Sequence, residues 1–241
     1  MKIRPNLSLS ADNPTQLIRQ LSAIDTTVPL INEGRTKEHR EQYMMARLLA
    51  TIAHTPLLKY PLQITHAEQP DFVFDFSESC IGVECVEANH PDNYHIEEIR
   101  ERMYPESMNF GQQFVAGTKT LTQDEKYEIA SGQYAGTAWA SGSMQRNWVE
   151  GMQFVIDGKT TKLRQGNYLA ERPTWLLIHD EWPNPIHFYP DKVREAAAKL
   201  HVLIAPLLNP PAFVHILLAS GDQLFQGTSI NQLRQRSSSW N

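Results

Sequence analysis

The chain has 241 residues, of which 41% are hydrophobic and 20% charged, a composition typical of a globular protein with a buried core. A mean hydropathy of −0.42 and the lack of a long apolar run argue against a membrane-spanning helix. The formal net charge of −5 excludes a general nucleic-acid binder held by overall positive charge. The start of the chain lacks an apolar signal-peptide segment, and two cysteines are too few for a disulfide framework, so we expect a cytoplasmic protein with no membrane partner.

The first half of the chain predicts two helices. Residues 1–12 are expected to be irregular, and a short helix should follow at 12–25, where Asp12 or Asn13 precedes Pro14. The stretch 34–56 is the strongest helix, because its apolar residues repeat at helical spacing until Pro56. Glu41 lies at the head of this apolar stripe, so we expect its carboxylate to face the body of the protein.

Three strands are predicted next, at 63–66, 71–76 and 81–87. The short turn at 77–79 makes the last two an antiparallel hairpin. Asp71, at the open end of its strand, should therefore lie near Glu84. An ionised carboxylate in or beside a sheet core is costly unless a cation pairs with it, and this pair of acids calls for such a partner.

Residues 89–146 differ in composition and are interpreted as an insertion, a candidate lid, with short helices at 96–103 and 123–130 and a loop at 135–147. Beyond it we expect a helix at 148–165, a buried strand at 174–181, a helix at 191–208 and a strand at 212–220. This order implies crossover connections and parallel strands. The end of the chain, 237–241, should be frayed.

The acidic residues are unevenly distributed. Residues 68–107 contain eleven Asp or Glu and two Arg, a balance of −9, so the rest of the chain carries +4. A metal-dependent enzyme acting on a polyanion would need such a separation of charge. Chance clustering of surface charge is the simpler explanation, because charge patterning is a weak signal.

The order of these elements and two short motifs resemble the PD-(D/E)XK nuclease superfamily. QPDF at 69–72 matches the first half of its motif, and IGVEC at 81–85 matches the strand that carries the second acid, similar to a GIEVT variant of bacterial and phage members. The resemblance covers residues 37–88 and 147–182. It implies an α/β fold, a mixed central sheet flanked by helices with a restriction-endonuclease-like α-β-β-β-α-β core, in one domain that spans 1–241.

The resemblance also implies a Mg²⁺-dependent (or Mn²⁺-dependent) phosphodiesterase acting on DNA or RNA. Asp71, Glu84 and the backbone carbonyl of Cys85 would be the metal ligands, since hard cations bind carboxylate and carbonyl oxygens. Glu41 would be an outer-shell acid that holds a water. A homodimer is a further expectation, because nucleases of this type often pair to cut two strands.

The sequence departs from the superfamily at the lysine position, two residues after Glu84, where Val86 stands. In the first of three explanations, the lysine has moved to the later helix, which makes Lys159 or Lys162 the candidate. In the second, Glu87 contributes in its place, although strand alternation points it to the opposite face. In the third, catalysis is lost, which leaves a nucleic-acid-binding or protein-interaction module.

Each candidate residue also has an ordinary structural explanation. Asp71 after a proline is typical of a turn, and Glu84 could lie on an uncovered face of the sheet. Glu41 could pair with Lys37 or Arg47 at the helix surface. Lys159 and Lys162 could be solvated lysines, and Cys85 could be a small residue of the core. The histidines show no zinc-ligand spacing. The HDE run at 179–181 is therefore expected to have a structural role. An acidic surface at 68–107 that contacts a basic partner is a further alternative.

Overall fold

The computed structural model describes residues 7–107, 113–118, 121–134, 136, 138–140, 142–165, 173–204, 213–228 and 234–237. Its centre is one eight-stranded sheet in which the strands follow the order of the chain. The strands are β1 (Ser8–Ala11), β2 (Leu62–His66), β3 (Phe72–Asp75), β4 (Cys80–Ala88), β5 (Thr174–Asp180), β6 (His215–Ser220), β7 (Gln223–Thr228) and β8 (Arg234–Ser237). The α-helices are α1 (Pro14–Leu21), α2 (Lys37–Ile52), α3 (Pro91–Met103), α4 (Gln123–Ala130), α5 (Ser143–Arg164) and α6 (Pro190–Ile204), with short 3-10 turns η1 (Ile31–Glu33) and η2 (Pro185–Phe188).

The sheet is mixed. Strands β1 to β4 form an antiparallel meander, β4, β5 and β6 are parallel, and β7 and β8 return antiparallel. The parallel strands are joined by α5 and α6, as crossover connections require. The expected α/β class, with a mixed sheet flanked by helices, is therefore confirmed.

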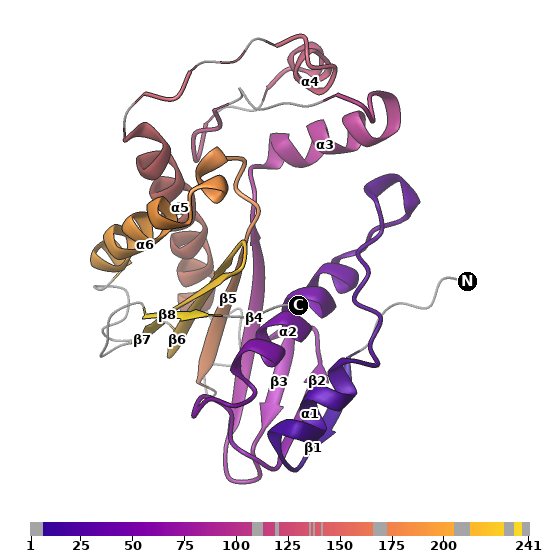
Figure 1. Ribbon diagram of the computed structural model, residues 1–241, viewed down its shortest axis with the longest axis vertical. Coiled ribbons are helices and arrows are strands. Elements are labelled where there is room, and N and C mark those ends of the chain that lie inside the picture. Colours follow the sequence, from indigo (N-terminus) through magenta and orange to yellow (C-terminus); the bar gives the residue numbers. More distant parts are fainter. Residues whose placement is uncertain are drawn as a thin grey trace.

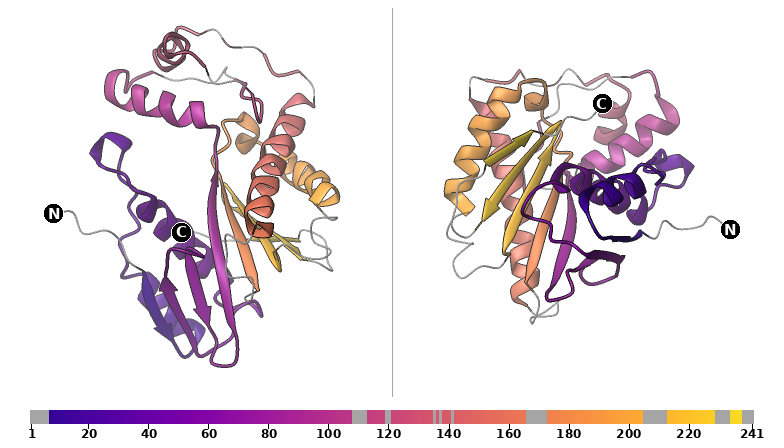
Figure 2. Two further views of the ribbon diagram at one scale, coloured as in Figure 1. Left: turned by 180° about the vertical axis from the view of Figure 1, so that it is seen from behind. Right: turned by 60° about the horizontal axis from the view of Figure 1, so that its bottom comes forward.

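Helices cover both faces of the sheet (Figures 1 and 2). On one face, α1 and α2 pack over β1 to β4 and bury Met45, Leu49 and Phe74 in a first core. On the other, α5 and α6 pack over β4 to β6 and bury Trp148, Met152 and residues of β5 in a second core. Helices α3 and α4 lie beyond the carboxyl end of β4, at the top of Figure 1.

Most elements form where local sequence predicts them. Thr36 is the N-cap of α2, and its backbone N–H donates to Nδ1 of His39, which fixes the start of the helix. The helix buries seven of its residues, Glu41 among them, on the side that faces the sheet. In the β3–β4 hairpin, Phe72 pairs with Val83, and one further step of this register sets Asp71 opposite Glu84.

Three expectations are wrong, and one hairpin was not expected. Residues 8–11, expected to be irregular, form β1, because their alternating buried side chains pair with β2; residues 1–6 lie outside the described part. The expected loop at 135–147 ends earlier, since α5 begins at Ser143. Helix α3 starts five residues before the predicted position. The final hairpin strands β7 and β8 were not predicted, and residues 238–241 of the expected frayed end lie outside the described part.

Because α5 packs closely against Trp182 at Gly151, we expect Gly151→Ala to lower the free energy of unfolding. An added Cβ on Gly151 would lie 2.5 Å from Cε2 of Trp182, a rigid indole. Overpacking of this kind typically costs about 1–3 kcal/mol. Gly158 on the same helix is the matched control: an added Cβ there meets nothing within 4 Å, so Gly158→Ala should raise stability by up to about 1 kcal/mol. Urea denaturation measures both, and equal effects would contradict the close contact.

No helix in the described ranges is long and apolar enough to cross a membrane.

Candidate active site

The candidate site forms where β4 extends past the end of β3. Strand β4 has nine residues and β3 has four, so their pairing stops at Phe72 and Val83. From Cys85 onward, one edge of β4 therefore has no β3 backbone to pair with. Since the N–H and C=O of one strand residue point the same way, both polar groups of Cys85 lie at this open edge.

The carboxylate of Asp71 fills the gap beside β4. Its Oδ2 accepts a hydrogen bond from the backbone N–H of Cys85 at 2.7 Å, and its Oδ1 contacts Nζ of Lys37 at 2.7 Å. The side chain is 2% exposed. Asp71 is thus held from two directions, by the neighbouring strand and by α2.

Glu84 meets the lysine that α5 contributes. Nζ of Lys159 lies 2.5 Å from Oε1 of Glu84 and 3.4 Å from the carbonyl oxygen of Cys85. The Glu84 side chain is 7% exposed and that of Lys159 is 17% exposed, so the pair is largely shielded from water. The ammonium lies beside two of the three oxygens that would be metal ligands according to the superfamily resemblance.

Glu41 of α2 is the third acid at this place, and together with Asp71, Glu84 and Lys159 it forms what we call the cluster. Its Oε1 lies 2.7 Å from Nζ of Lys37, the same ammonium that contacts Asp71, and its Oε2 lies 3.0 Å from Nε2 of His66 at the end of β2. Burial raises the pKa of Glu41, and the negative charge of Asp71 adds to this, while the contacts with Lys37 and His66 partly oppose it. The pKa of Lys37 is nonetheless raised, because its two carboxylate partners outweigh the effect of partial burial.

This raised pKa predicts a pH-dependent effect of Glu41→Gln. A carboxyl with a higher pKa in the folded than in the unfolded chain stabilises the fold most below the unfolded pKa, and that contribution is lost as pH rises through the folded pKa. The free energy of unfolding of the wild type minus that of Glu41→Gln should therefore fall between about pH 4 and pH 7. Urea denaturation at both pH values measures it.

The control for this experiment is Glu150→Gln, at an exposed glutamate of α5. The free energy of unfolding of Glu150→Gln should differ from that of the wild type by less than about 0.5 kcal/mol at both pH values. A difference for Glu41→Gln that rises with pH would contradict the assigned direction of the Glu41 shift.

Cys85 contributes its backbone rather than its thiol. The side chain packs in the first core, and burial raises its pKa well above the usual value, with the charges of Asp71, Glu41 and Glu84 adding to the effect. The thiol therefore stays neutral, and its carbonyl and N–H are the groups that face the candidate site.

The structure brings Lys159, and not Lys162, to the acids. Lys162 is exposed near the end of α5. Val86, at the superfamily's lysine position, packs against the second core beneath the helices on that face. Glu87 points to the opposite face, as strand alternation predicts, where it forms an ion pair with Arg40 of α2.

Two partners of the acids were not assigned to the site from sequence. Lys37 was expected only as a surface partner of Glu41, but it also contacts Asp71, 34 residues away. His66 carried no motif. The only sequence signal for its place in the site was its position at the end of a predicted strand. In the structure His66 lies next to Asp71 in the sheet, because it pairs with the following residue, Phe72, in the register of β2 and β3.

The oxygens at the cluster are of the chemical type that hard divalent cations bind. Asp71, Glu84 and the Cys85 carbonyl supply carboxylate and carbonyl oxygens, which Mg²⁺ binds while keeping several waters. In the described ranges no group of three or more His, Cys, Asp or Glu side chains is arranged to hold a metal ion. A metal here would accordingly depend on two carboxylates and one backbone oxygen.

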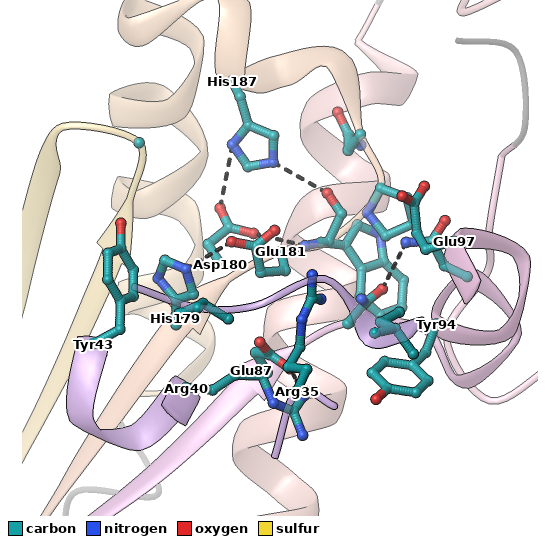
Figure 3. A pocket seen from close by; sticks show the side chains of 18 of the residues that line it. Arg35, Arg40, Tyr43, Glu87, Tyr94, Glu97, His179, Asp180, Glu181 and His187 are labelled. Carbon is teal, nitrogen blue, oxygen red and sulfur yellow. Dashed lines mark hydrogen bonds and ion pairs between the residues drawn. The ribbon is translucent and has the colours of Figure 1, made fainter. Parts of the chain in front are cut away.

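A cavity of about 770 Å³ lies beside the cluster, between α2, α3 and the carboxyl end of β5 (Figure 3). Arg40 and Glu87 form part of its wall; they are one residue before Glu41 and three after Glu84. The cavity is therefore adjacent to the acids and Lys159, but these residues do not line it.

The HDE run at the end of β5, residues His179, Asp180 and Glu181, lines this cavity. Asp180 accepts hydrogen bonds from Nε1 of Trp148 at 2.6 Å and from Oγ of Ser220 at 2.7 Å. His179 pairs with Glu181 at 2.6 Å. These contacts tie together α5, β5 and β6, which agrees with the structural role expected from sequence.

We found no match between this chain and any family model, curated protein or solved structure.

Proposed function

We propose that this protein is a metal-dependent phosphodiesterase that cleaves DNA or RNA, with a core of the restriction-endonuclease type. One observation carries the proposal: Glu41, Asp71, Glu84 and Lys159 come from four different elements and meet around the open edge of β4. Nothing in the packing of two hydrophobic cores requires three buried carboxylates at one place. The order of elements from α2 to β5 supports it further.

The charges at the cluster favour a cation. Three buried carboxylates, those of Glu41, Asp71 and Glu84, gather at this place, and Lys37, one of the lysines that pair with them, is 63% exposed. A dication bound by Asp71, Glu84 and the Cys85 carbonyl would add positive charge among these buried acids. When bound, Mg²⁺ supplies Lewis-acid stabilisation of charge on the scissile phosphate and lowers the pKa of water.

The remaining residues orient the reacting groups. The ammonium of Lys159 has three donors, of which the contacts to Glu84 and Cys85 use two, so one is available for a phosphate oxygen or a water. Lys37 bridges Glu41 and Asp71 and thereby fixes the direction of both carboxylates. Glu41, with its raised pKa, is suited to accept and hold a proton near this edge.

The proposal is tested by measuring metal binding and cleavage on the same preparation. Mn²⁺ binding is followed by electron paramagnetic resonance, and cleavage is assayed on single-stranded and duplex DNA and on RNA, with Mg²⁺ and with EDTA. We expect Mn²⁺ to bind and cleavage to require the metal. Cleavage that persists unchanged in EDTA, or no cleavage of any substrate, would contradict the proposal.

A catalytically inactive member of the same fold, acting as a nucleic-acid-binding or protein-interaction module, is the second candidate. Val86 at the lysine position favours it. The same experiment separates the two: nucleic-acid binding in the absence of Mn²⁺ binding and cleavage would support the inactive module.

A further inference from the structure

The cavity beside the cluster has the size and lining of a ligand site. Its volume of about 770 Å³ is in the range of pockets that enclose a small molecule, roughly 300–1,000 Å³. It lies at the carboxyl end of β5, where open α/β sheets commonly bind ligands. Figure 3 shows Arg35, Arg40 and Glu87 facing the run His179–Glu181 across it, with Tyr94 at the side.

Helix α2 contributes side chains both to the acids and to the cavity. Lys37 and Glu41 point to Asp71, while Arg40, Tyr43 and Arg47, at spacings of three and four residues, line the cavity. On β4, Cys85 and Glu87 lie on the same face, about 7 Å apart along the strand, roughly the rise of two extended residues. A chain whose phosphate lies at the acids could therefore extend directly into the cavity.

The charge of the lining selects among nucleic-acid ligands. Three arginines, Arg35, Arg40 and Arg47, face five acidic residues: Glu87, Glu97, Glu101, Asp180 and Glu181. Most are paired within the wall; Arg40 contacts Glu87, and Arg35 contacts Glu101 at 3.3 Å. A lining with more carboxylates than arginines disfavours a run of phosphates. It suits a nucleobase, whose amino groups donate to carboxylates, with one phosphate at the arginines.

Two aromatic rings in the lining can stack on a base. Phe188 in η2 is 71% exposed, an unusual position for a phenylalanine with no core role, and it lines the cavity. Tyr94 of α3 also lines the cavity, with the guanidinium of Arg40 5.6 Å from its ring centre. Aromatic platforms beside a groove are how proteins bind the bases of single strands.

We propose that this cavity binds one or two unpaired nucleotides next to the scissile phosphate, so that the substrate is single-stranded or has a frayed or extruded nucleotide. The inference rests on the proposed function and adds the class of substrate. A paired duplex is too wide for a cavity of this volume, whereas a nucleotide is of the size that such cavities enclose.

The test measures binding without cleavage. A fluorescein-labelled six-nucleotide single strand, as DNA and as RNA, and a labelled blunt-ended DNA duplex without unpaired nucleotides are titrated with the wild-type protein in EDTA, and binding is followed by fluorescence anisotropy. We expect at least one single strand to bind at least ten-fold more tightly than the duplex. Equal or tighter binding of the duplex would overturn the inference.

Matched variants assign the binding to the cavity. Phe188→Ala should weaken single-strand binding about 5- to 100-fold, the usual effect of losing one stacked base. Tyr189→Ala is the control, because Tyr189 is also exposed, at 53%, but does not line the cavity; binding should change less than two-fold. An unchanged affinity of Phe188→Ala would overturn the inference.

The outcomes separate the two proposals. A protein that cleaves nucleic acid with Mg²⁺ but binds duplex as tightly as single strand refutes only the substrate class. A protein that binds single strands through Phe188 but never cleaves refutes the enzymatic function and leaves the cavity as a single-strand binding site.

Discussion

Asp71→Asn is expected to reduce Mg²⁺-dependent cleavage by about 100- to 1,000-fold. A metal contributes several kcal/mol of transition-state stabilisation, and each 1.36 kcal/mol corresponds to a factor of ten. Replacing one carboxylate oxygen with an amide removes a charged ligand at the proposed metal. The side-chain oxygen of asparagine can still accept the N–H of Cys85, so the hairpin should fold. Cleavage rates and Mn²⁺ affinity are the two measurements.

The matched control is Asp75→Asn, at the other end of the same strand, where the aspartate is exposed. This variant should cleave at the wild-type rate. Full activity in a folded Asp71→Asn protein would remove Asp71 from the proposed mechanism, and with it the assignment of the metal ligands.

Lys159→Met is expected to lower the free energy of unfolding by about 3–5 kcal/mol in EDTA. The substitution keeps the length and packing of the side chain but leaves the Glu84 carboxylate buried without its ammonium partner, and breaking a buried ion pair in this way has a cost of that order. Urea denaturation measures the loss. Lys162→Met, at an exposed position one turn further along α5, should change stability by less than about 0.5 kcal/mol.

A divalent metal should recover part of this stability. In the wild type the ammonium of Lys159 lies beside Glu84 and the Cys85 carbonyl, the same oxygens proposed for the metal. Without the ammonium, Mg²⁺ no longer competes with it for these two oxygens and should bind more tightly; at one hundred times its dissociation constant a ligand of the folded state adds about 2.7 kcal/mol. We expect Mg²⁺ to stabilise Lys159→Met more than the wild type. Equal stabilisation of both proteins would show that the metal binds elsewhere.

Local patterns in the sequence were enough to predict the elements that build the site. The helical spacing of the apolar residues in α2 predicted that Glu41 faces inward, and Glu41 is buried. The short turn between β3 and β4 predicted the antiparallel hairpin, and with it that Asp71 lies near Glu84. These features depend on a few neighbouring residues, so the chain order alone specifies them.

Other features depend on contacts between residues far apart. Lys159 and Lys162 were equivalent candidates, because both lie on one helix; the packing of Trp148, Met152 and Ile156 sets the rotation of α5 and turns Lys159 toward Glu84. The cavity was not foreseen, since its walls come from segments more than one hundred residues apart. Periodicity reports which face of an element is buried, but the partner that covers the face is decided only when the separate elements pack together.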